Sequence, residues 1–84
     1  MEPNIKIREH LFEIIKNQIE SNEPPETKLT YNRLRKDGYD DFVTKQMIGQ
    51  CLAIELFNVM KYKKPYDNIR YIMNLKKLPK EPFN

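Results

Sequence analysis

Residues 40–62 constrain the fold of this 84-residue chain more than any other stretch, because they read as one long helix that is apolar over most of its circumference. At about 100° per residue, one broad arc of that helix holds Val43, Met47, Ile48, Cys51, Leu52, Ile54, Leu56 and Val59. A second, narrower apolar patch holds Phe42, Ala53, Phe57 and Met60. A helix that is hydrophobic nearly all round lies inside its protein. We therefore expect a central helix with other elements packed around it.

Three shorter helices are expected to cover this central one. Their boundaries follow from amphipathic spacing, from two consecutive prolines after the first helix, from Gly38 after the second and from Pro79 after the last. The expected helices span residues 5–21, 26–36, 40–62 and 67–78, followed by a tail at 79–84. No stretch shows the alternation of a strand, so the sequence predicts an all-α fold, a single four-helix domain of residues 1–84.

The periodicity also assigns an inner face to each shorter helix. The side chains expected to face inward are Ile7, Leu11, Ile14, Ile15 and Ile19 on the first helix, Leu29, Leu34 and one or both of Thr30 and Tyr31 on the second, and Ile69, Ile72, Met73, Leu75 and Leu78 on the last. A chain of this length buries only somewhat over about 60% of the surface that its unfolded form exposes. Its core is therefore small, with little room for an enclosed active site.

The cysteine content and the N-terminus suggest a compartment. Cys51 is the only cysteine; it cannot form an intramolecular disulfide, and its place in the apolar arc favours a packing role. The absence of a disulfide framework favours a reducing compartment. Residues 1–4 are polar and lack the apolar centre of a signal peptide, and no apolar run reaches the ~18 residues of a membrane span. We expect a cytoplasmic chain with no membrane contact.

The formal net charge of +3 comes from lysines in the C-terminal half. They cluster where two helices are expected to end, at Lys61, Lys63 and Lys64 and again at Lys76 and Lys77. Cations are favoured at helix C-termini, so solvated helix ends are the preferred interpretation. Weak non-specific nucleic-acid binding through these lysines is the alternative. A recognition helix is disfavoured, because the central helix is apolar nearly throughout and opens with two aspartates.

One carboxylate, Glu55, projects into the apolar arc of the central helix. A charge there must be paired, bind a cation or carry a proton, because an unpaired buried charge is very costly. The only histidine, His10, borders the inner face of the first helix and is one candidate partner. The alternative partners are Arg8, Tyr62, Arg70 and Tyr71. We interpret Glu55 first as a structural anchor, second as a divalent-metal ligand together with His10, and third as a side chain that reaches solvent.

No arrangement typical of catalysis is found. Ser21 is the only serine and has no base nearby, Cys51 is expected to be buried, and the two glycines form no phosphate-binding loop. Metal-binding spacings such as HExxH and CxxC are missing from the sequence. The chain is predicted not to be an enzyme and to need no cofactor, unless a divalent metal binds at His10 and Glu55.

Several short motifs resemble a family of short, uncharacterised bacterial helical proteins, a domain of unknown function. The motifs are a first-helix histidine, a Pro-Pro-Glu connection and a Glu-hydrophobic-aromatic step in the central helix. The matching residues are His10, Asn22-Glu23-Pro24-Pro25-Glu26, Ile48-Gly49, Leu52-Ala53, Glu55-Leu56-Phe57, Pro65-Tyr66-Asp67 and Arg70-Tyr71. Family members carry a second histidine where this chain has Gln46, which puts a two-histidine cation site in question. The resemblance spans nearly the whole chain and implies a compact helical fold without a known activity.

The second apolar patch, formed by Phe42, Ala53, Phe57 and Met60, needs a cover. The second and fourth helices could bury it, or it could remain exposed and mark a protein partner or a homodimer seam. These two readings stay open at this point. The preferred function is a non-enzymatic protein-interaction or accessory module.

Overall fold

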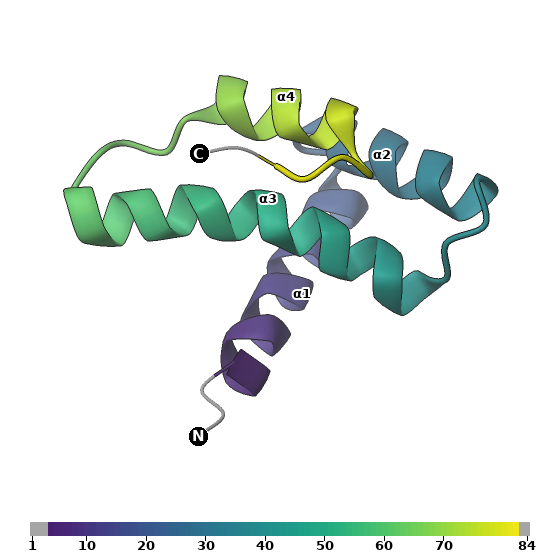
Figure 1. Cartoon of the computed structure of the whole chain (residues 1–84), viewed down its shortest axis with the longest axis horizontal. Helices are drawn as coiled ribbons and strands as arrows, with labels where there is room; N and C mark the ends of the chain where they lie inside the picture. Colours follow the sequence, from purple (N-terminus) through teal and green to yellow (C-terminus); the bar gives the residue numbers. More distant parts are fainter. Residues whose placement is uncertain (1–3, 83–84) are drawn as a thin grey trace.

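The computed structural model describes residues 4–82, with side chains from Lys6 onward, as four helices. These are α1 (Asn4–Ser21), α2 (Pro25–Lys36), α3 (Asp41–Tyr62) and α4 (Asn68–Lys77), shown in Figure 1. No strand occurs among the described residues, so the predicted all-α, four-helix fold is confirmed. Every helix end lies within one residue of its expected position. The end of the expected tail, Phe83 and Asn84, falls outside the described residues.

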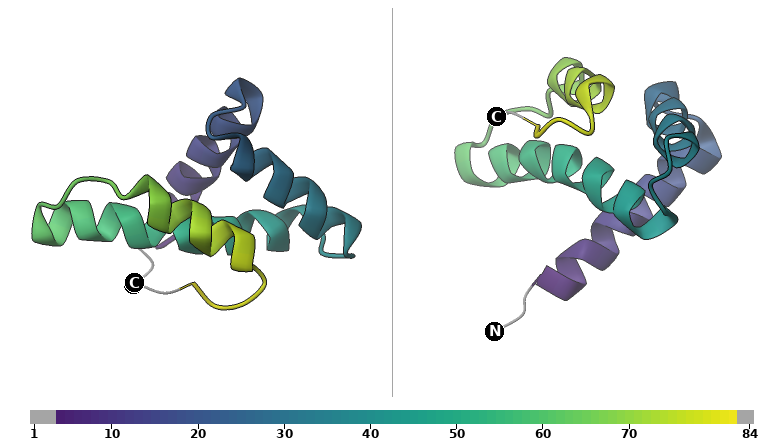
Figure 2. Two further views of the ribbon diagram at one scale, coloured as in Figure 1. Left: turned by 90° about the horizontal axis from the view of Figure 1, so that it is seen from above. Right: turned by 45° about the vertical axis from the view of Figure 1, so that its right-hand side comes forward.

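The long helix α3 is the centre of the fold and contacts the other three helices. Helix α4 lies along one side of α3 and runs in the opposite direction, whereas α1 crosses α3 on another side (Figures 1 and 2). The N-terminal half of α1 extends beyond the other helices in Figure 1 and in the right-hand view of Figure 2. Within residues 4–82, no helix has both the length and the apolar character needed to cross a membrane.

Local sequence signals set the helix ends. The Asp40 side chain accepts a hydrogen bond of 2.8 Å from the Val43 N–H and so caps the start of α3. Gly38, with φ 107°, makes the left-handed turn after α2 that glycine adopts at low cost. Lys63 ends α3 in the same left-handed region, with φ 56°.

Helix α4 is held at both ends by side chains. At its start, the Asp67 side chain accepts a hydrogen bond of 3.1 Å from the Arg70 N–H. At its other end, the Arg33 guanidinium of α2 donates to the Leu75 and Leu78 carbonyls at 3.1 and 2.9 Å. The Leu75 carbonyl also accepts a hydrogen bond of 3.2 Å from the Leu78 N–H, so Arg33 adds a second donor at this end of the helix.

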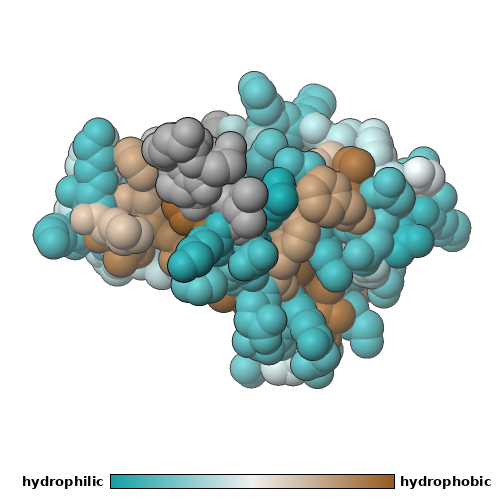
Figure 3. All heavy atoms as spheres, turned by 90° about the horizontal axis from the view of Figure 1, so that it is seen from below, coloured by the Kyte–Doolittle hydropathy of each residue, from teal (hydrophilic) through white to brown (hydrophobic). Residues whose placement is uncertain are grey.

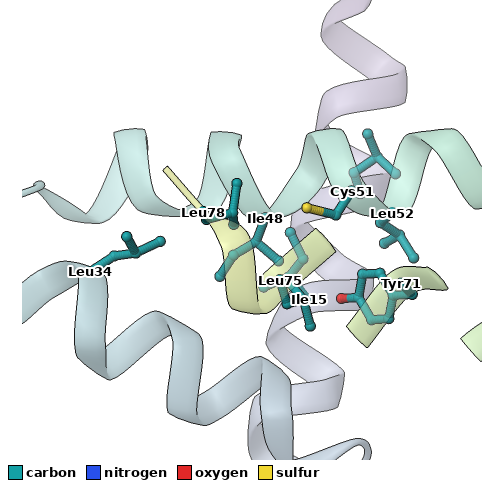
Figure 4. Close-up of a cluster of buried hydrophobic side chains, with 9 residues drawn as sticks. Ile15, Leu34, Ile48, Cys51, Leu52, Tyr71, Leu75 and Leu78 are labelled. Carbon is teal, nitrogen blue, oxygen red and sulfur yellow. The ribbon is translucent and has the colours of Figure 1, made fainter. Parts of the chain in front are cut away.

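The hydrophobic core takes side chains from every helix (Figure 4). Its buried members are Leu11 and Ile15 from α1, Leu34 from α2, Ile48, Cys51 and Leu52 from α3, Tyr71 and Leu75 from α4, and Leu78 just after it. At the crossing of α1 and α3, a Cβ added to Gly49 would lie 3.9 Å from Ile15 and 4.0 Å from Leu11. The crossing is thus close, yet it leaves room for one methyl group.

The expected inner faces are wrong at several positions. Ile7, Leu29, Ile69 and Met73 were expected inside, but all are exposed, Ile69 by 73% and Leu29 by 66%. Helix α2 instead buries Thr27 beside the expected Leu34 and Thr30, and α4 buries Tyr71 and Asn74. Ile7 is exposed because the N-terminal half of α1 extends past α3.

Candidate functional site

Glu55 lies at the junction of α3 and α4, fully enclosed and fully hydrogen-bonded. Arg70 donates to it in a bidentate arrangement, Nε to Oε2 at 2.6 Å and Nη2 to Oε1 at 3.0 Å. The Asp67 N–H adds a third hydrogen bond, at 3.1 Å to Oε1. The hydrogen bonds to Glu55 raise the pKa of Arg70, so the guanidinium stays charged. The carboxylate therefore fixes the first turn of α4 against α3.

Of the five candidate partners for Glu55, Arg70 is the one whose side chain pairs with it. His10 is exposed on α1, and the oxygens of Glu55 are already used by Arg70 and Asp67. Across the described part of the chain, no three His, Cys, Asp or Glu side chains are grouped so as to hold a metal ion. The described residues therefore offer no third ligand beside His10 and Glu55, and the divalent-metal site stays a prediction.

A second polar cluster, not expected from the sequence, ties three helices together. Tyr71 of α4 donates its hydroxyl to Gln18 Oε1 of α1 at 2.8 Å, and Thr27 of α2 donates to the same oxygen at 2.7 Å. Gln18 follows Leu11 by seven residues and Ile14 by four, so its inward position could have been recognised from helical spacing. Burial raises the pKa of Tyr71 to about 12. The hydroxyl thus acts as a hydrogen-bonding group inside the core.

Cys51 is a packing residue, as its position in the sequence suggested. The thiol is buried, and it donates to the Met47 carbonyl at 3.7 Å. Burial raises its pKa to about 12, so the side chain is a thiol and not a nucleophilic thiolate at neutral pH.

The lysines of the predicted anion-binding surface are all exposed but lie in two separate groups. Lys61, Lys63 and Lys64 are at the end of α3, whereas Lys76 and Lys77 are at the end of α4. Because α4 runs back along α3, its length separates the two groups (Figure 1). The structure does not bring them together into one basic surface.

The second apolar patch of α3 faces outward. Phe42 is 47% exposed, Phe57 is 49% exposed and Met60 is 76% exposed, with Ala53 half-buried between them. These four residues are three, four or eleven positions apart and so share one face of the helix. We call this face the α3 stripe. Neither α2 nor α4 covers it, which decides between the two readings that the sequence left open.

A shallow groove joins the α3 stripe to the projecting half of α1. It has a volume of about 230 Å³ and is lined by Ile7, Arg8, Leu11, Phe12, Gln46, Gly49, Gln50 and Ala53. On the face of the molecule from which α1 projects, apolar surface is seen in separate patches between hydrophilic side chains (Figure 3). Arg8 is the only charged residue among those that line the groove.

Two cations lie over aromatic rings at the ends of the stripe. The Arg8 guanidinium is 5.3 Å from the centroid of the Phe42 ring, which also meets Phe12 edge-on at 5.7 Å. The Lys61 ammonium is 5.2 Å from the Phe57 ring and 5.5 Å from the Tyr62 ring. Such contacts are worth about 0.5–1 kcal/mol at exposed sites. They hold positive charge directly beside the apolar surface.

No protein-family model, curated protein or solved structure matches this chain. The resemblance to a family of uncharacterised bacterial proteins therefore stays a prediction.

Proposed function

We propose that this chain is a non-enzymatic protein-interaction module, which docks a partner protein or a second copy of itself on the α3 stripe and the adjoining groove. One observation supports this most directly: three large apolar side chains on a single face of the central helix are about half exposed or more. Large apolar side chains exposed on one face of a folded protein are typical of interaction sites. A cytoplasmic location is part of the same proposal, supported by the single buried cysteine.

The exposed stripe is at odds with the rest of the molecule, where polar groups are well satisfied. No buried side-chain nitrogen or oxygen of the described residues lacks a hydrogen-bond partner. The interior is thus well ordered, and the exposed apolar residues are not the consequence of a poorly packed domain. A binding role accounts for them without further assumptions.

The test compares wild type with Phe57→Glu and with Leu29→Glu, a matched control in which an exposed leucine of α2 receives the same charge away from the stripe. Each protein is first shown to be folded by circular dichroism. Self-association is then measured by sedimentation, and partners are captured by affinity purification from cells. A complex formed by wild type and by Leu29→Glu should be lost in Phe57→Glu. Equal behaviour of all three proteins would contradict the proposal.

The nucleic-acid and metal alternatives have less support. The lysines form two separate groups, and the carboxylate of Glu55 is occupied by Arg70. We therefore do not propose either function.

A further inference from the structure

We infer that two copies of this chain associate through the outer face of α2 and α4, in an arrangement in which each α2 runs antiparallel to the α2 of the other copy. This face is separate from the α3 stripe, so a dimer formed there is independent of the proposed function. Three features support the dimer: the apolar side chains that the face exposes, the spacing of its residues along α2, and the opposite charges at the two ends of α2.

The outer face of α2 and α4 carries large apolar side chains. Leu29, Ile69 and Met73 are all exposed, and the least exposed of them, Met73, is 43% exposed. Ile69, Met73 and Lys76 are four and three residues apart and so share one side of α4. Lys76 and Leu29 line a shallow groove of about 190 Å³ between the two helices, which joins both sets into one surface. In the left-hand view of Figure 2, α2 and α4 are nearest to the reader and no other described helix lies in front of them.

Four residues of α2 form a row along this face. Glu26, Leu29, Arg33 and Lys36 follow one another at intervals of three, four and three residues, which is the spacing of a seam between two packed helices. The first three of them line the groove between α2 and α4. The Arg33 guanidinium donates to two carbonyls at the end of α4, so its hydrogen bonds are made within the chain. The row thus has an acid at one end, a lysine at the other and Leu29 between them.

Opposite charges at the two ends make the row self-complementary. Glu26 lies in the first turn of α2, and Lys36 is its last residue. When two α2 helices pack antiparallel across a two-fold axis, Glu26 of each copy lies beside Lys36 of the other. Leu29 is two residues from the midpoint of this row, or about 3 Å at ~1.5 Å per residue. The two Leu29 side chains therefore meet close to the axis, between two pairs of opposite charges.

The parallel orientation is unfavourable. Helices α2 and α4 run in the same general direction, because Thr27 lies 3.3 Å from Tyr71 in their first halves and Arg33 reaches the end of α4 (Figures 1 and 2). A two-fold axis along the helices would stack α2 on α4 of the other copy and would bring Lys36 against Lys76. Like charges oppose association, so only the antiparallel orientation pairs the charged ends favourably.

The size of the face indicates a weak dimer. Helix α2 has 12 residues and is therefore about 18 Å long, and two helices packed ~10 Å apart present a width of about 20 Å. This footprint is smaller than that of a standard interface, which buries ~800 Å² on each partner. The dimer should therefore be reversible and should form at high protein concentration.

Sedimentation velocity of the full chain, at protein concentrations up to about 1 mM, tests the dimer. Wild type should shift from monomer towards dimer as the concentration rises. Met73→Glu places a charge within the apolar part of the face and should weaken association by at least about tenfold. Leu29→Glu should act in the same way and yet keep any complex that depends on the α3 stripe. Phe57→Glu, on the stripe, should leave the α2 and α4 dimer unchanged.

Exchange of the two end charges tests the antiparallel arrangement. Glu26→Lys and Lys36→Glu should each weaken self-association about five- to tenfold, because both contacts in the dimer then join like charges. A mixture of the two variants should associate within about threefold of wild type, because both contacts then join opposite charges. Lys28→Glu, at an exposed lysine of α2 outside the row, is the matched control and should not rescue Glu26→Lys. Circular dichroism first shows that each variant is folded.

Each contrary result has a distinct meaning. Wild type that stays monomeric over the whole concentration range would overturn the dimer. Self-association that Phe57→Glu abolishes and Met73→Glu does not would overturn it in favour of the α3 stripe, and would support the proposed function. A dimer that Met73→Glu weakens but that the mixture of charge variants does not restore would overturn the antiparallel arrangement.

Discussion

The two sides of α3 differ in what they bury: one side encloses a charged residue, and the other exposes apolar residues. Toward α4, a charged residue, Glu55, is completely enclosed, and both its oxygens are hydrogen-bonded. On the opposite side, the apolar Phe57 and Met60 stand in solvent. The comparison shows that partners, rather than residue type alone, decide what is buried. One side of the helix therefore stabilises the domain, whereas the other leaves large apolar side chains exposed.

Removing Arg70, the partner of Glu55, tests the side of α3 that faces α4 and should have the largest effect on stability. Arg70→Ala leaves a buried carboxylate without its counterion and should lower the free energy of unfolding by about 3–5 kcal/mol, measured by urea denaturation. The double variant Glu55→Met/Arg70→Met is the control and should recover much of the loss. A loss below about 1 kcal/mol in Arg70→Ala would mean that water solvates Glu55 in the folded state.

The dependence of stability on alkaline pH is a second test of the buried side of α3. Burial raises the pKa of Tyr71 from 10.0 and that of Cys51 from 9.0, each to about 12. The folded state therefore keeps protons that the unfolded state loses. The resulting contribution to the free energy of unfolding is fully present below pH ~9 and is lost as the pH rises to ~12. For Tyr71 the loss is about 2–3 kcal/mol. Urea titrations at successive pH values measure it, and a Tyr71→Phe/Cys51→Ala variant should show a shallower decline.

The two glycines extend the comparison, because Gly49 lies where α1 meets α3 and Gly38 lies in the turn between α2 and α3. Gly49→Ala should stabilise the domain by up to about 1 kcal/mol, because alanine favours a helix and the new methyl group would make ordinary contacts with Ile15 and Leu11. Gly38→Ala should destabilise it by about 1–2 kcal/mol, because its φ is 107°. Thermal melts compare the two variants. A less stable Gly49→Ala would show that the helices cannot accept even one methyl group there.

Substitutions on the exposed side of α3 should have little effect on stability. Met60→Gln is expected to change the free energy of unfolding by no more than about 0.5 kcal/mol, because Met60 is 76% exposed. The matched interior substitution on the same helix, Leu52→Ala, should cost about 2–5 kcal/mol. Comparable losses in the two variants, measured in parallel by urea denaturation, would mean that the stripe is covered in solution.

The four helices were predictable because their signals are local. Two prolines, a glycine in a left-handed turn and aspartate caps fix the ends with little help from tertiary structure. The inner faces of the helices were less predictable, since the burial of a side chain depends on which other helix packs against it. Leu29 and Ile69 are apolar and exposed, while Thr27 and Asn74 are polar and buried.

At the site, too, local features could be predicted from the sequence, whereas features that depend on tertiary packing could not. That Glu55 needs a partner could be deduced from its helical neighbours, but Arg70 was only one of five alternatives, because the choice depends on how α4 packs on α3. The Gln18 and Tyr71 cluster was missed, since it joins residues 53 positions apart. The exposure of the stripe, left open by the sequence, likewise depended on where the shorter helices lie.

Helix α4 is held by Glu55 at its start and by Arg33 at its end, and this has a consequence for folding during synthesis of the protein. A helix of 10 residues is too short to be stable alone in water. Helix α4 therefore forms only once α2 supplies Arg33 and α3 supplies Glu55. Since α4 leaves the ribosome after both, the nascent chain holds Glu55 hydrated and the core open until α4 emerges. Folding of this domain is thus a late, nearly all-or-none event, completed by its last helix.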